Sequence, residues 1–288
     1  MTNGGALKSP EDKRDWNITR CMDIPTGGAK IPASFVCDIP EAVRDQGAVN
    51  SCTAHAMATI LSCISHKLYG KHLSFSAGFL YGNRRETDYK GSGEIMRDVP
   101  KKAAKWGDVP ETVWENTSEA PEIITAFEKA YPEVGAFSKK LIAGYVRLYD
   151  KNEAKAFMVR YGIPLFVSMR MNKISPFLGD GYHAMVCYKY GTTGFSCVNS
   201  WGEKDIPYVN GKKFDDFEEV WGLIPNEETK FTDLPDTHWA KEAICDAVQN
   251  GEMQGFPDGT FHPDEPITRA QMAVILQRMR QIKDGEKA

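Results

Sequence analysis

The sequence predicts an α+β fold with two lobes, followed by a small all-α module. Three observations lead to this prediction. Apolar residues recur at helical spacing from Cys52 to Leu68, just before Gly70. Short apolar runs typical of strands fill much of the region 143–225. The charged stretch 226–230 then separates that region from two further helical patterns. Periodicities of this kind are the main sequence signals of helices and strands.

These patterns place the helices of the main domain mostly before its strands. The helical segments are predicted to lie at 52–68, 95–106 and 152–160. The strands are predicted at 143–148, 163–169, 183–189, 195–198 and 220–225. The first lobe is therefore expected to be helical, and the second to be an antiparallel sheet.

Changes in composition divide the chain into four parts. Residues 1–30 are polar and are predicted to form an extended strap on the surface. Residues 31–225 form the main domain, 226–230 a charged linker and 231–288 the final module. That module is predicted to be a helical hairpin, with helices at 239–249 and 268–279. Thr268 is a suitable N-cap for the second of them.

Composition excludes several classes of partner. The chain has 288 residues and a formal net charge of −4, so it has no basic surface typical of nucleic-acid binding. No apolar run approaches the ~18 residues of a membrane span, and the N-terminus lacks the apolar region of a signal peptide.

Seven cysteines without a close C-x-x-C pair favour a reducing environment and predict no zinc site. No cofactor is predicted.

The candidate chemistry begins at Cys52, the first residue of a predicted helix. A helix N-terminus stabilises a thiolate, and a thiolate is a nucleophile. A single cysteine there is also compatible with simple packing in a core. Gln46 lies six residues before Cys52, across a short turn that contains glycine. His183 is predicted to begin one apolar strand, and Asn199 to end a second apolar strand. An imidazole can pair with a thiolate and protonate a leaving amine, and an amide oxygen can fix the ring's orientation.

Three segments carry a resemblance to a known family. QGAVNSC, GYHAMVCYKYG and VNSWG occur in this order between residues 46 and 202. They resemble the three conserved blocks of papain-like (clan CA, family C1) cysteine peptidases, and the resemblance covers about residues 31–225. It implies a two-lobed papain-like fold with a cleft between the helical lobe and the β lobe.

The resemblance also implies a role for each residue that matches a motif. Cys52 corresponds to the nucleophile and His183 to its acid/base partner. Asn199 corresponds to the residue that orients the histidine. Gln46 corresponds to an oxyanion-hole donor beside the Cys52 backbone amide. Trp201 corresponds to the tryptophan that shields the His–Asn pair from water.

The substrate-binding residues are predicted from weaker matches. Gly93 is the candidate for main-chain contact with a peptide, although it also suits an ordinary helix start. Asn50 stands where the family has glycine, at the wall of the cleft. Val49 replaces a disulfide cysteine, Thr53 a tryptophan and His55 a phenylalanine. These departures leave the four catalytic positions intact and put the substrate pocket in doubt.

The final module resembles a second family. Residues 231–279 contain F-x-D, HWA-x-x-AI, PDGTF and ITRAQ, which are similar to S-layer homology (SLH) modules. These usually bind pyruvylated secondary cell-wall polysaccharide, which implies that Arg269 meets the acidic sugar, with Trp239 and Asp233 shaping the site. Such modules usually come in threes. A single copy leaves open glycan binding, homo-oligomerisation or docking on the main domain.

Together these features predict a cysteine peptidase that hydrolyses peptide bonds in a peptide or protein substrate, through a thioester, at the bacterial cell envelope. A transpeptidase or ligase using the same site is an alternative, as is a catalytically weakened cell-wall-binding protein. The SLH module favours the cell wall or exterior. The missing signal peptide and the free cysteines leave the cytoplasm as the other location.

Overall fold

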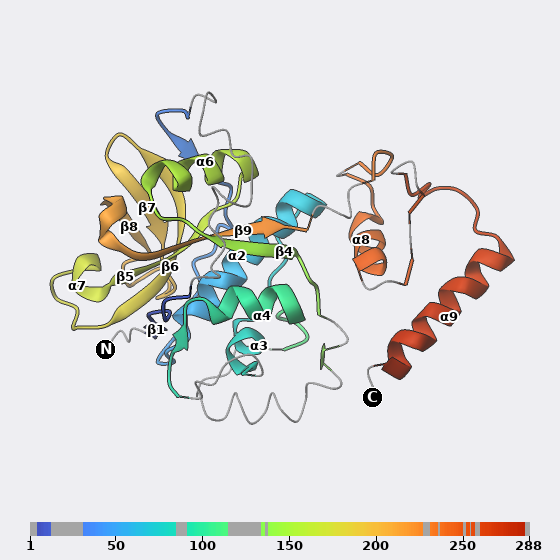
Figure 1. Ribbon diagram of the computed structural model, residues 1–288, viewed down its shortest axis with the longest axis horizontal. Helices are drawn as coiled ribbons and strands as arrows, with labels where there is room; N and C mark the ends of the chain where they lie inside the picture. The colour runs from blue at the N-terminus through green and yellow to red at the C-terminus, as the bar shows by residue number, and fades with distance from the viewer. Residues whose placement is uncertain are drawn as a thin grey trace.

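The computed structural model describes most of the chain (Figure 1). The described residues are 5–12, 31–84, 91–114, 134–135, 138–226, 231–235, 237–249, 252–253, 255–256 and 260–285. Most of the predicted strap and linker lies outside these ranges. Within them, no helix is both long enough and apolar enough to cross a lipid bilayer.

The first lobe is built around helix α2, Cys52–Tyr69. Its apolar residues recur on several sides, and nearly all its side chains are buried, so α2 is a central rather than a surface helix. It ends at Gly70, whose φ of 76° is left-handed and whose amide donates to the His66 carbonyl at 2.8 Å. The shorter helices α3, Ala77–Gly82, and α4, Asp98–Trp106, pack against it. The predicted central helix is thus confirmed.

The second lobe is a curled, mostly antiparallel sheet, shown at the left of Figure 1. The strand order along its main path is β3 (Glu94–Ile95), β1 (Ala6–Leu7), β6 (Tyr182–Gly191), β5 (Leu165–Arg170), β9 (Phe217–Pro225) and β4 (Ile142–Arg147). Two further strands, β2 (Phe35–Val36) and β7 (Gly194–Val198), also pair with β6, and β8 (Tyr208–Lys212) pairs with β7. Helix α6, Lys151–Tyr161, packs against β9, and α7, Met171–Ile174, follows β5.

The α+β, two-lobed prediction is confirmed, because the helical lobe and the sheet meet along α2 and β6. Every side chain from His183 to Cys187 in β6 is buried, so this part of the strand is covered on both faces. β6 pairs with β5 over six residues, from Leu165↔Cys187 to Arg170↔Tyr182. This register fixes the start of β6, which carries His183, against the helical lobe.

Two very short strands correct the sequence-based picture. β1, Ala6–Leu7, pairs parallel with β3, Glu94–Ile95, and antiparallel with β6 at Tyr182. The predicted surface strap is therefore wrong at this point, because Ala6 is only 3% exposed. The predicted helix 95–106 is also too long at its start: pairing with β1 holds Glu94–Ile95 extended, and α4 begins at Asp98. β2, Phe35–Val36, pairs with β6.

The final module contains α8, Lys241–Gln249, and α9, Arg269–Gly285 (Figure 1). Thr268 caps α9 as expected: its hydroxyl accepts from the Gln271 amide at 3.1 Å, and the Gln271 side chain accepts from the Thr268 amide at 2.8 Å. Acidic residues of α8 face the main domain, where Lys139 forms ion pairs with Asp246 and Glu242.

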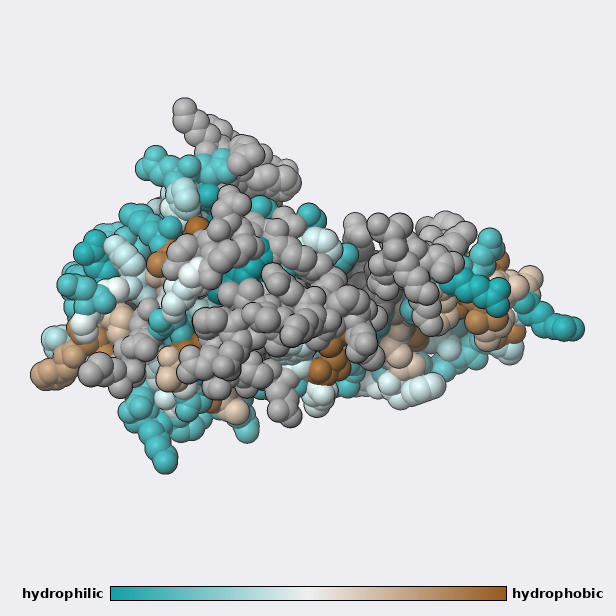
Figure 2. All heavy atoms as spheres, turned by 90° about the horizontal axis from the view of Figure 1, so that it is seen from below, coloured by the Kyte–Doolittle hydropathy of each residue, from teal (hydrophilic) through white to brown (hydrophobic). Residues whose placement is uncertain are grey.

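The surface of this module is partly apolar. Figure 2 shows hydrophobic residues among the hydrophilic ones at the right-hand end of the molecule. The large apolar residues exposed in the final module are Trp239, Phe256, Ile267, Met272, Val274 and Leu276.

Candidate active site

Cys52 lies at the junction of the two lobes. It is the first residue of α2, and its sulfur accepts a hydrogen bond from the Ala184 amide of β6 at 3.4 Å. The side chain is fully buried. A residue of the helical lobe is thus held against the strand that carries His183.

His183 and Asn199 form the second part of the site. Nε2 of His183 lies 2.5 Å from Oδ1 of Asn199, and the amide nitrogen of Asn199 donates to the Ile206 carbonyl at 3.0 Å. That second bond fixes which end of the amide faces the ring. The ring of Trp201 lies over His183 with a centroid separation of 4.3 Å. Asn199 and Trp201 therefore hold the imidazole in one orientation and cover it.

The other imidazole nitrogen has a different environment. Nδ1 of His183 is buried and bonds to no other group in the described part of the chain. Because Nε2 already faces Asn199, Nδ1 is the nitrogen left to exchange a proton with a reacting group.

Gln46 is positioned by the segment that follows β7. Its side-chain oxygen accepts from the Ser200 hydroxyl at 2.8 Å, and its amide nitrogen donates to the Val49 carbonyl at 2.7 Å. The Gln46 backbone amide also donates to the Ser200 carbonyl at 2.9 Å. Since one hydrogen of an NH₂ group serves Val49, the other is available to a developing oxyanion.

The two titrating groups are both neutral in this arrangement. Burial raises the pKa of the Cys52 thiol to about 11, although backbone amides near the sulfur lower it. Burial likewise lowers the pKa of His183 to about 4, against the opposing effect of its bond to Asn199. Near pH 7 the pair is a thiol and an imidazole rather than a thiolate and an imidazolium.

The Cys52 thiol is buried in part by the chain's own N-terminal segment, which lies beside it. The Gly5 backbone lowers the pKa of the Cys52 thiol, and the Gly5 carbonyl accepts from the Glu94 amide at 2.8 Å. The next strand residues continue the pairing, with the Leu7 carbonyl accepting from the Met96 amide at 3.0 Å. A Cβ atom at Gly5 would lie 2.0 Å from the Asn50 carbonyl oxygen, so only glycine fits there. This segment excludes solvent from the thiol.

The predicted substrate-binding residues lie along that segment. Gly93 has a φ of 85°, and a Cβ atom there would lie 2.5 Å from the Gly5 carbonyl oxygen. The side chain of Asn50 donates to the Ser92 hydroxyl at 2.8 Å. Both residues therefore lie against Gly5, at the place where the resemblance expects a substrate cleft.

A buried charge cluster supports the segment around Gly93, and the sequence did not indicate it. The carboxylate of Glu94, fully buried, forms an ion pair with Lys102 and accepts from the Thr53 hydroxyl at 3.0 Å. Lys102 also donates to the Leu80 carbonyl at 2.6 Å, and Arg84 donates to the Gly93 carbonyl at 3.1 Å. Thr53, which stands where the resemblance expects tryptophan, thus binds the strand that lines the cleft.

The candidate glycan-binding residues of the final module are less closely grouped. The carboxylate of Asp233 accepts from the amides of Phe261 and His262, at 2.8 and 2.7 Å, so it stabilises a loop. Trp239 is 89% exposed, and Arg269 is exposed at the start of α9.

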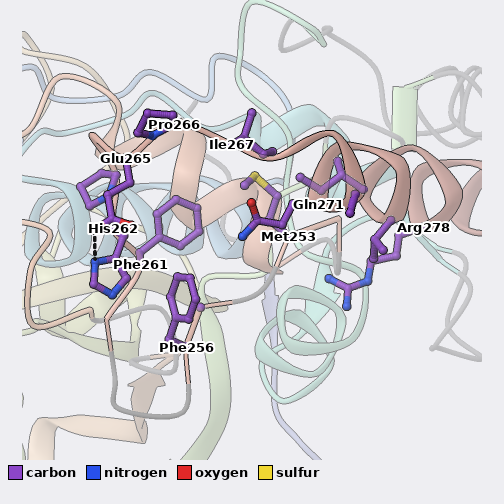
Figure 3. Close-up of a pocket in the computed structure, with 14 residues that line it drawn as sticks. Met253, Phe256, Phe261, His262, Glu265, Pro266, Ile267, Gln271 and Arg278 are labelled. Atoms are coloured by element: carbon purple, nitrogen blue, oxygen red, sulfur yellow. Dashed lines mark ion pairs between the residues drawn. The ribbon is translucent and has the colours of Figure 1, made fainter.

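A cavity of about 570 Å³ lies elsewhere in this module (Figure 3). Phe256, Phe261 and Pro266 line it together with the polar residues Gln271 and Arg278, and none of the three predicted residues does. His262 and Glu265 form an ion pair at its edge, with 3.2 Å between Nδ1 and Oε1.

Comparison with known proteins relates the two parts of the chain to different groups. Residues 230–273 match the S-layer homology domain family. Cell surface glycoprotein 1 of Acetivibrio thermocellus is 49% identical over 57 residues, 19% of this chain. The cellulosome-anchoring protein of the same organism is 41% identical over 111 residues, 37% of this chain. The chain spans 2% and 24% of the length of these two relatives.

The main domain has the fold of papain-like cysteine proteases. The crystal structure of xylellain, a cysteine protease from Xylella fastidiosa, superimposes with a TM-score of 0.61 and 22% sequence identity. The match covers 77% of this chain and 95% of that protein. The expected resemblance to papain-like peptidases and to SLH modules is therefore confirmed at the level of fold and of the SLH segment.

Proposed function

We propose that this protein is a cysteine peptidase of the cell envelope, held closed in the described state by its own residues 5–7. The observation that carries the proposal is the hydrogen-bonded His183–Asn199 pair under Trp201, beside a cysteine at the start of α2. The fold of the main domain supports the same activity.

The proposed reaction begins when the N-terminal segment leaves the cleft. Exposure to water removes the burial that raises the Cys52 pKa, and the proton passes to Nδ1 of His183. The thiolate attacks the substrate carbonyl carbon, and the oxyanion is stabilised by the Cys52 backbone amide and the Gln46 side chain.

The reaction then proceeds in two steps, acylation of Cys52 and hydrolysis of the thioester. His183 gives its proton to the leaving amine, so the peptide C–N bond breaks and a thioester remains on Cys52. His183 next takes a proton from water, which attacks the thioester and releases a carboxylate and the Cys52 thiol. Throughout, Asn199 holds Nε2 of the ring, which leaves Nδ1 to exchange the proton.

A location at the cell envelope is supported by the SLH segment at 230–273. Its relatives include a protein named for the cell surface and one named for anchoring the cellulosome. We propose that the final module binds an acidic cell-wall polysaccharide and brings the peptidase to proteins of that layer.

Covalent trapping tests the peptidase proposal. The full chain carrying Gly5→Val, which opens the cleft, is incubated with an epoxide peptide inhibitor under reducing conditions, and the adduct is located by peptide mapping. We expect one adduct, on Cys52, and none after Cys52→Ala or His183→Ala is added. Cys63→Ala is the matched control, because Cys63 is another buried thiol of α2.

Hydrolysis is then measured on a fluorogenic peptide library. Cleavage that depends on Cys52 supports the proposal, and a product joined to an added amine assigns a ligase instead. If the folded Gly5→Val variant forms no adduct and cleaves no peptide, the peptidase proposal is wrong. Pull-down with purified cell-wall polysaccharide tests the envelope location independently.

A further inference from the structure

We propose a binding site for a divalent transition metal such as Zn²⁺. It lies at the C-terminal end of α2, opposite the nucleophile. Its ligands are the side chains of Asp38, His66 and His72. Each offers one ligand atom, and these atoms lie within 4.8 Å of one another. Two imidazoles and a carboxylate suit zinc, with a fourth position left for water.

The spacing of the ligand atoms is close to what a metal requires. Oδ2 of Asp38 lies 2.8 Å from Nδ1 of His66 and 3.0 Å from Nε2 of His72. With bonds of about 2.0–2.1 Å, tetrahedral ligands lie roughly 3.3 Å apart, so small side-chain shifts suffice. The two imidazole rings are stacked, with centroids 4.5 Å apart, so both present their nitrogen edges to the same oxygen.

The second nitrogen of His72 is held by the helix. Nδ1 lies 3.2 Å from the Ser62 carbonyl oxygen and 3.5 Å from the Ser62 hydroxyl, while Nε2 lies 3.0 Å from the Asp38 carboxylate. A backbone carbonyl bonded to the distal nitrogen is also the usual outer-shell partner of a metal-binding histidine.

All three ligands are held by rigid parts of the fold. His66 lies in the last turn of α2, where the helix carbonyls favour a cation. The His72 loop is fixed to α2 by Ser65, whose hydroxyl donates to the Lys71 carbonyl and accepts from the Leu73 amide. Asp38 follows Cys37, whose amide is bonded to the Tyr188 carbonyl of β6 at 2.7 Å.

The site is open to solvent and separate from the reaction centre. His72 lines a surface cavity of about 490 Å³, which gives the metal an entry path and room for water. His66 lies about 21 Å from Cys52 along the helix axis, at 1.5 Å per residue. We therefore infer that the metal ties the segment after β2 to the end of α2, and does not take part in peptide hydrolysis.

Zinc and cobalt titrations of the full chain test this proposal. After chelator treatment, Zn²⁺ affinity is measured by competition with a chromogenic chelator, and Co²⁺ binding by its visible absorption. We expect one equivalent, with affinity falling on the order of 10–100-fold or more in Asp38→Ala and His66→Ala, since losing even an outer-shell partner has that effect. Zn²⁺ should also raise the Tm of the wild-type chain but not of these variants.

The matched control is His262→Ala, because His262 is a partly exposed histidine that lies beside the carboxylates of Glu265 and Asp233. It should bind Zn²⁺ as the wild type does. Asp38 is exposed, so Asp38→Ala is expected to fold, and near-UV circular dichroism checks this. The proposal is overturned if wild type binds no Zn²⁺, if Asp38→Ala binds it equally, or if Co²⁺ shows sulfur charge-transfer bands from cysteine.

Discussion

The backbone of Gly5 lies beside the sulfur of Cys52, the proposed nucleophile, and lowers the pKa of that thiol. A residue near the start of the chain therefore covers the thiol at the start of α2, from 47 positions away. Neither residue is exposed, and the pairing of β1 with β3 and β6 extends the same contact along the cleft. The segment that covers Cys52 is thus also a strand of the sheet.

Opening this contact should make Cys52 reactive. In Gly5→Val the new side chain would overlap the Asn50 backbone, so residues 5–7 must leave the cleft. Burial is the main cause of the raised Cys52 pKa, so that pKa should fall. Each unit of fall raises the thiolate fraction at neutral pH about tenfold. Iodoacetamide labelling, followed over pH by intact mass, measures the rate.

Gly179→Val serves as the control, because a Cβ atom at Gly179 meets nothing within 4 Å. It should label as slowly as the wild type. Equal labelling of Gly5→Val and wild type would show that the N-terminal segment does not control access to the thiol.

Removing the imidazole should abolish most of the proposed turnover. In the Gly5→Val background, His183→Ala should lower kcat by about 10²–10⁴, the usual contribution of a general acid/base. Asn199→Ala leaves Nε2 without its acceptor, so it should lower kcat with less effect on KM and shift the acidic limb of the pH profile. Steady-state kinetics over pH measure both. An unchanged kcat in His183→Ala would contradict the assigned role.

The cluster behind the cleft should contribute strongly to stability. Lys102→Met removes one of the two cations that pair with the buried Glu94 carboxylate and leaves only Arg84, at 3.8 Å; breaking a buried ion pair typically costs about 3–5 kcal/mol. Thr53→Val removes one hydrogen bond to the same carboxylate and should cost about 1–3 kcal/mol. Urea denaturation gives both values. Lys105→Met, at an exposed position of α4, should stay within about 0.5 kcal/mol of wild type. Equal effects of Lys102→Met and Lys105→Met would exclude the cluster as a source of stability.

Two buried histidines should make the fold sensitive to acid. Burial lowers the pKa of His183 to about 4 and that of His55 to about 3, from 6.5. Below pH 6.5 the unfolded chain binds protons that the folded chain does not, so the free energy of unfolding decreases as pH falls. The slope is at most about 1.4 kcal/mol per pH unit for each histidine.

Replacing one of them should flatten that slope. His55→Phe keeps an aromatic ring at the buried position and removes its titration. Urea denaturation of both proteins between pH 4 and 6.5 measures the difference. An identical pH dependence would show that folding does not lower the pKa of His55.

The elements predicted correctly are those with a local pattern. α2 carries helical spacing and a Gly70 stop, and β5, β6, β7 and β9 carry apolar runs that are buried in the sheet. The motifs placed Cys52 at the start of a helix and His183 near the start of a strand, as α2 and β6 show, while Asn199 follows β7 rather than ending it. β8 was missed, since its sequence YVNGK is too polar to read as a strand.

The features that escaped prediction depend on contacts between distant segments. β1 and β3 have two residues each and depend on pairing with distant segments: β3 pairs with β1, and β1 pairs also with β6. Glu94 and Lys102 read as ordinary surface charges, because only the folded chain buries them together. The position of Asp38 beside His66 and His72 also depends on the folded chain, because no rule of sequence spacing connects Asp38 with these histidines.

Covering the cleft also affects how the protein withstands oxidants. None of the six cysteines in the described part of the chain forms a disulfide, and all six are buried, Cys52 among them. Peroxide converts a thiolate to sulfenic and then, irreversibly, to sulfinic acid, and a buried neutral thiol largely escapes. We expect peroxide to add oxygen to Cys52 in Gly5→Val far faster than in wild type, as peptide mass mapping would measure. Residues 5–7 would thereby keep the Cys52 thiol chemically intact for as long as they cover it.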